Sequence, residues 1–157
     1  MNVLRWWLFA TSFMATLPSM AQESPNTVAA GRIWGYYNVV SAAQTECANR
    51  FPSRRAHFDS GIQPWLFRNR PAMEKAVSNS VDHLKQLAIT ETERAQAMEV
   101  WSQTQAMLQE RIKSEVLNKM SDNPVQFCEA MTALLSSAQG ELSVRFPQEF
   151  RILGISP

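Results

Sequence analysis

The sequence predicts an all-α protein: an antiparallel bundle of four to five helices, closed by one disulfide and followed by a short packed C-terminal tail. Three observations lead to this expectation. Apolar residues recur at alternating spacings of three and four in successive segments, which is the periodicity of one helix face. No Gly or Pro occurs between Ala72 and Asn123, and no strand-like alternation is long enough to suggest a sheet. The third observation is a pair of cysteines, Cys47 and Cys128, in two of these segments.

The first 21 residues have the layout of a secretory signal peptide. Arg5 precedes the apolar run 6–17, and the small residues Ser19 and Ala21 suit a cut after Ala21. An apolar run of about a dozen residues is shorter than the roughly 20 that a membrane span needs, although an uncleaved N-terminal anchor is the alternative. We therefore expect a periplasmic or secreted protein whose mature chain, residues 22–157, forms a single helical domain.

The charge of the mature chain gives no indication of an anionic partner. The whole chain carries 15 Lys and Arg against 14 Asp and Glu. Loss of Arg5 with the signal peptide would leave no net charge, so neither nucleic acid nor an anionic membrane is expected as a partner.

The two cysteines of the mature chain are expected to pair. An even number of cysteines in an oxidising compartment predicts a disulfide. The bridge Cys47–Cys128 would close a loop of about 80 residues, and the chain-entropy model gives up to about 4.5 kcal/mol for such a loop. No Cys-x-x-Cys motif is present, so a thiol-exchange enzyme is not expected. The alternative is two buried free thiols.

The first half of the mature chain is interpreted as three helices. The apolar stripe of residues 29–47 places Cys47 on the buried side of the first helix, which ends near Pro52. Residues 53–70 predict a short helix that is broken or kinked near Pro64. The next helix is expected to begin at Asn69-Arg70-Pro71, with the proline in its first turn, and to run to about residue 88.

The second half is interpreted as two helices and a tail. Thr90 and Glu93 form the Thr-x-x-Glu capping box of a helix that runs to about Met120. Asp122-Asn123-Pro124 is a start signal for the last helix, and Gly140 is expected to end it. The tail, residues 141–157, is too apolar to be disordered, so we expect it to pack along the bundle.

Catalytic motifs are missing from the sequence. It has no His-Glu-x-x-His, Gly-x-Ser-x-Gly or Ser-x-x-Lys motif, no phosphate-binding glycine loop and no Cys-x-x-Cys-His. His57 and His83 are the only imidazoles, and a zinc site needs three or four converging ligands. We therefore expect no catalytic residue, no metal and no cofactor. A cell-envelope hydrolase with an unrecognised carboxylate or His site is one alternative.

One segment has the composition of a binding surface. Residues 50–70 combine five arginines with interleaved Phe and Trp, and these residue types are enriched at interface hot spots. The alternative places the aromatics in the core and the arginines on its rim. The sequence thus predicts a non-catalytic periplasmic protein that binds another protein or peptide, in an inhibitor-like, immunity-like or adaptor role. The residues expected to form the binding surface are Arg54, Arg55, Trp65, Arg68 and Arg70.

A five-residue segment suggests a second alternative. Residues 89–93 read Ile-Thr-Glu-Thr-Glu, which resembles the Leu-Thr-x-x-Gln signature of the Spy/CpxP periplasmic chaperones. The resemblance implies a small, helical, non-enzymatic protein with holdase activity. Glu93 stands where the signature has Gln, and no second copy occurs. The capping box explains the same residues.

Overall fold

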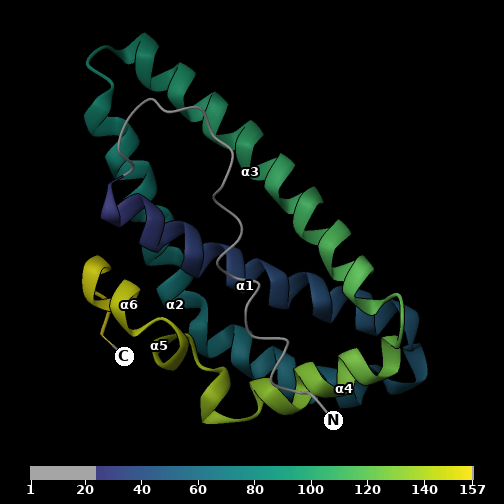
Figure 1. Cartoon of the computed structure of the whole chain (residues 1–157). Helices are drawn as coiled ribbons and strands as arrows, with labels where there is room; N and C mark the ends of the chain where they lie inside the picture. Colours follow the sequence, from purple (N-terminus) through teal and green to yellow (C-terminus); the bar gives the residue numbers. More distant parts are fainter. Residues whose placement is uncertain (1–23, 157) are drawn as a thin grey trace.

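The structure, a computed structural model, describes residues 24–156 (Figure 1). The expected signal peptide and its cleavage site lie outside these residues. The described part of the chain is helical and contains no strand. Its elements are α1 (Pro25–Arg50), the 3₁₀-helix η3 (Pro52–Arg54), α2 (Arg55–Leu87), α3 (Glu91–Met120), α4 (Pro124–Leu135), the 3₁₀-helix η4 (Ala138–Gly140), α5 (Leu142–Arg145) and α6 (Pro147–Leu153).

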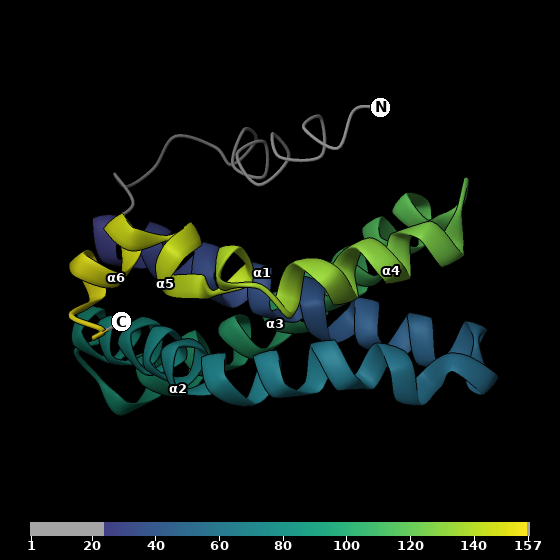
Figure 2. The ribbon, with the colours of Figure 1, turned by 90° about the horizontal axis from the view of Figure 1, so that it is seen from below.

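The helices form a bundle around α1, which packs against α2, α3, α4 and α6. In Figure 2, α4, α5 and α6 follow one another along one side of the molecule and α2 lies on the opposite side. The disulfide Cys47–Cys128 joins the end of α1 to the first turns of α4, and both cysteines are fully buried. The predictions of an all-α bundle and of this disulfide are confirmed.

Burial divides the molecule into a body and an arm. The hydrophobic core lies among α1, the first two thirds of α2, the last turns of α3, α4 and the C-terminal segment. Between Ala76 and Ile112, by contrast, Ala88 is the only buried residue. We call residues 77–111 the arm, which comprises the end of α2, the connection and most of α3. The other described residues, 24–76 and 112–156, are the body. Figure 1 shows α3 diverging from α2 and crossing the molecule at an angle.

One prediction about the helices was wrong. Residues 53–88 do not form two helices that are separated near Pro71, because α2 runs through both Pro64 and Pro71. A proline inside a helix costs about 3 kcal/mol, through a lost hydrogen bond and a clash with the preceding turn. Packing offsets this cost here, since Ile62 and Trp65 are fully buried. The Tyr37 hydroxyl also donates a hydrogen bond to the Leu66 carbonyl at 3.2 Å.

The helix that follows Asn123 ends earlier than expected. It stops at Leu135, and Gly140 instead lies in η4. A Cβ at Gly140 would be 2.5 Å from the Leu134 carbonyl oxygen, so glycine allows this turn to fold back against the end of α4. The tail packs on the bundle as expected, through the buried side chains of Leu142, Phe146, Phe150 and Leu153.

Candidate functional site

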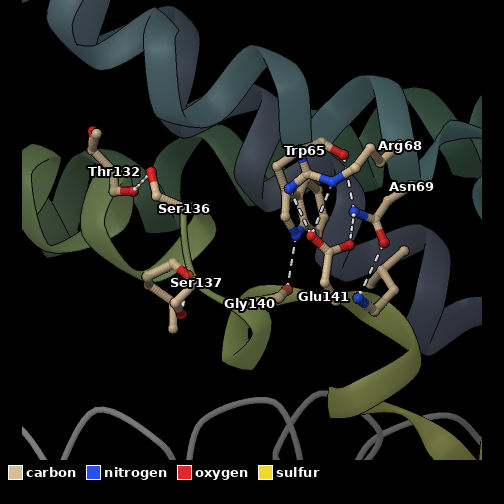
Figure 3. A network of polar contacts seen from close by, with 10 residues as sticks. Trp65, Arg68, Asn69, Thr132, Ser136, Ser137, Gly140 and Glu141 are labelled. Atoms are coloured by element: carbon tan, nitrogen blue, oxygen red, sulfur yellow. Dashed lines mark hydrogen bonds and ion pairs between the residues drawn. The ribbon is translucent and has the colours of Figure 1, made fainter.

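The predicted binding residues do not form one surface. Trp65 is fully buried, and its indole Nε1 donates to the Gly140 carbonyl at 2.8 Å (Figure 3). Its ring lies 5.9 Å from those of Tyr36 and Tyr37. Trp65 therefore lies in the core and not on the exposed surface of α2.

Arg54 takes part in a polar cluster that connects η3 and α2 to α4. Its guanidinium donates to Glu129, which also interacts with His57 Nε2 at 2.8 Å. The guanidinium carbon lies 5.2 Å from the centre of the Phe58 ring. The hydrogen bond from His57, together with the charge of Arg54, lowers the pKa of Glu129 below its usual value. Arg54 therefore fixes the start of α2 against α4.

Arg68 has an equivalent role further along α2. Its Nη2 and Nε donate to Glu141 Oε1 at 2.6 and 3.1 Å (Figure 3). Asn69 Nδ2 donates to Glu141 Oε2 at 2.9 Å, and the Leu142 amide donates to Asn69 Oδ1 at 3.1 Å. Together with the bond from Trp65, these contacts attach the start of the C-terminal segment to α2.

The remaining two arginines are exposed and lie apart from each other. Arg55 contacts Asp59 at 3.4 Å, one turn along α2. Arg70 is exposed and forms no ion pair with the described residues. Because 15 residues separate the two, they lie about 22 Å apart along the helix axis. The alternative interpretation, with the aromatics in the core and the arginines on its rim, describes Arg54, Trp65 and Arg68.

A different surface has the character of a binding site. A shallow, open depression of about 490 Å³ lies between α2 and α3 in the arm. We call it the arm groove; it is lined by Leu84, Glu93, Gln96, Ala97, Val100, Trp101 and Thr104.

Several large apolar side chains of the arm remain in contact with solvent, and one of them, Val100, lines the arm groove. The exposed fraction is 63% for Val100, 66% for Met107, 66% for Leu87 and 85% for Ile89. Exposed apolar side chains that gather on one surface commonly mark a protein interaction site.

The sequence pattern of α3 contains a signal for the face that lines the arm groove. Ala97, Val100, Thr104 and Met107 follow each other at spacings of three and four, which places them on one face of α3. On this face Val100 and Met107 are exposed, whereas Ile112 and Val116 further along α3 are buried in the core.

Glu93 places a negative charge at one end of the arm groove. Its Oε2 accepts hydrogen bonds from the backbone amides of Ile89 and Thr90 at 2.9 and 2.8 Å. The Thr90 hydroxyl in turn accepts from the Glu93 amide, so the predicted capping box is confirmed. These hydrogen bonds lower the pKa of Glu93, which keeps its carboxylate ionised at neutral pH.

Among residues 24–156, one histidine lies within hydrogen-bonding distance of a carboxylate. His57 and Glu129 lie within hydrogen-bonding distance, but their side chains are 51% and 38% exposed. No Ser, Thr or Cys side chain among residues 24–156 hydrogen-bonds the His57 ring, as a nucleophile activated by a histidine base would.

The described residues contain neither a cluster of metal ligands nor a membrane-spanning helix. No group of three or more His, Cys, Asp or Glu residues is placed to hold a metal ion. No helix in this part of the chain combines the length and the apolarity that crossing a bilayer requires.

Comparison with known proteins identifies no relative of this chain. No family model, curated protein or solved structure matches the chain. The functional interpretation therefore depends on the arm groove and on the polar clusters of the body.

Proposed function

We propose that this chain is a non-catalytic periplasmic protein that binds another protein or peptide, and that the arm groove is its binding surface. The scaffold in this proposal is an antiparallel bundle of four to five helices, of which α2 and α3 extend into the arm. The observation that carries the proposal is the exposed apolar lining of the groove, with Val100 63% exposed beside Leu84 and Trp101. Buried apolar surface is the main favourable term in most protein association.

The contacts of Arg54 and Arg68 support a structural role for these two arginines and not a role in partner binding. Arg54 and Arg68 each connect α2 to a carboxylate more than 70 residues away in the chain. A partner that recruited these guanidinium groups would first have to break the contacts to Glu129 and Glu141. Partner binding at the groove leaves both contacts intact.

The expected location agrees with the chemistry of the body. The N-terminal pattern of charged, apolar and small residues supports export. The disulfide Cys47–Cys128 supports an oxidising compartment, since such bonds are rare in the cytosol.

Site-specific photo-crosslinking tests the proposed surface. A photoreactive amino acid at Val100 should crosslink to a discrete partner in intact cells. The same group at Ser102, which is exposed and about 200° further around α3, should not. Val100→Glu should abolish the capture of this partner and Ser102→Glu should leave it unchanged, because only the first charge enters the groove. Equal crosslinking from both positions would contradict the assignment of the surface.

The second candidate function is a holdase-type chaperone. The exposed side chains of Leu87, Ile89, Val100 and Met107 favour it, because unfolded clients are bound through apolar surface. A holdase should suppress the aggregation of several unrelated denatured proteins, and Val100→Glu should reduce this effect. A protein with one dedicated partner should suppress none of them.

A further inference from the structure

Building on the proposed function, we infer that the occupant of the arm groove is an amphipathic helix of about three turns that carries a Lys or Arg at the end next to Glu93. The groove supplies the length, the apolar contacts and the charge that specify this occupant. If the arm groove binds no peptide at all, this inference fails together with the proposed function.

The length follows from the residues that line α3. The lining extends from Glu93 to Thr104, about 17 Å along a helix axis at 1.5 Å per residue. A helix of about 12 residues has the same length. On the other side the groove is lined by Leu84 of α2, so a bound helix would lie along α3 and contact α2 at this residue, as in other helix-in-groove complexes.

The apolar contacts follow from the side chains along this length. Leu84 lies on the α2 side, and Val100 and Trp101 lie on the α3 side. Ala97, one turn before Trp101, is a small residue and leaves space for an incoming side chain. A peptide helix with Leu or Met at positions i, i+3, i+4 and i+7 presents apolar side chains at the matching intervals.

The charge follows from Glu93, the only charged residue in the lining. The capping box uses Oε2 and holds the carboxylate in one place, whereas Oε1 accepts no hydrogen bond from the described residues. The neighbouring Glu91 is paired with Arg94 at 3.5 Å. A Lys or Arg on the peptide would therefore meet a fixed, ionised acceptor, and an acidic residue there would be repelled.

A labelled synthetic peptide tests the inference. The probe is a peptide of about 14 residues with blocked termini. Four Leu residues form one face of its helix, and Ala and Gln fill the other positions. The probe is made with one Lys at either end, and matched versions carry Gln in place of Lys. Binding to the exported, disulfide-bonded protein is followed by fluorescence anisotropy. The Lys peptide whose charge lies next to Glu93 should bind more tightly than the peptide with Lys at the other end, and Val100→Glu should weaken the binding of both by about tenfold or more because it places a charge in the apolar groove.

Glu93→Gln isolates the charge. The Gln side chain retains the capping box but removes the negative charge. This variant should bind the Lys peptide about two- to fivefold more weakly, the range for an exposed ion pair. Its affinity for the Gln peptide should be unchanged. Thr92→Gln, an exposed change in the same turn, is the matched control.

The possible outcomes separate the two levels of the proposal. If the Lys and Gln peptides bind the parent protein equally well, the inferred cationic end is wrong and the arm groove remains a binding site. If no peptide binds, or if Val100→Glu changes nothing, the inferred helix and the groove both fail. If sedimentation shows a dimer that Val100→Glu dissociates, the occupant is a second copy of this chain and the inferred peptide is wrong.

Discussion

Trp65 both packs in the core and forms a hydrogen bond to a distant segment of the chain. Its ring fills the space between α1 and α2 beside Tyr36 and Tyr37, and its Nε1 binds the Gly140 carbonyl. Buried indoles usually satisfy their N–H in this way. Trp65 thus links the core to the start of the C-terminal segment.

Replacing Trp65 should be costly for this reason. Trp65→Phe leaves a cavity and a buried carbonyl without its donor, so the free energy of unfolding should fall by about 2–3 kcal/mol. Urea unfolding followed by circular dichroism measures this loss. Trp101→Phe, at a partly exposed site in the arm, should cost less than about 1 kcal/mol. Equal losses at the two sites would contradict the role assigned to Trp65.

For single residues, the sequence identified important side chains in segment 50–70 but not the contacts that they make. The composition of segment 50–70 identified Arg54, Trp65 and Arg68 as unusual. Their partners Glu129 and Glu141 come from segments more than 70 positions away. Local composition cannot show such pairings, because they depend on how the helices pack.

Among the helices, α2 departs most from what its sequence predicts. Local rules place a break near Pro64 and a new start at Pro71. The observed 33-residue helix is stabilised by contacts with α1 and α4 that the local rules do not include. One such contact is at Gly61, where a Cβ would lie 2.7 Å from Thr132 Cγ2. The α3 start, by contrast, was correctly predicted because its signal is local: the capping box of Thr90 and Glu93.

The capping box should control the stability of the arm locally. Thr90→Ala removes the acceptor for the Glu93 amide, which costs about 1 kcal/mol. Because the arm has few buried contacts, it should open without unfolding the body. Amide hydrogen exchange in the first turn of α3 should therefore become about fivefold faster, with little change in the urea midpoint. Thr92→Ala is the matched control, and a large change in the midpoint would show that arm and body unfold together.

For the molecule as a whole, the disulfide is a covalent long-range constraint on the body. It joins residues 81 positions apart, between α1 and α4. Its position was predictable from the two cysteines and the expected signal peptide. The division into body and arm was not, because periodicity shows that a helix has an apolar face but not whether the fold provides a partner for it.

Loss of the disulfide should destabilise the body strongly. The double variant Cys47→Ala, Cys128→Ala should lose up to about 4.5 kcal/mol of unfolding free energy in the chain-entropy model. Urea unfolding with and without reductant measures the same effect in the parent protein, and reductant should not affect the variant. The parent, denatured without reductant, should show no free thiol. Two titratable thiols would contradict the bridge.

The sparse burial of the arm also has a consequence for how this protein can change over generations. Core positions such as Phe58 and Ile62 tolerate few substitutions, since each affects folding. Val100, Met107 and Leu87 contribute little to the core, so other side chains at these positions alter the surface at small cost to stability. Under the proposed function, the body can thus remain constant while the arm acquires new specificities, in the way that a conserved framework carries variable recognition loops.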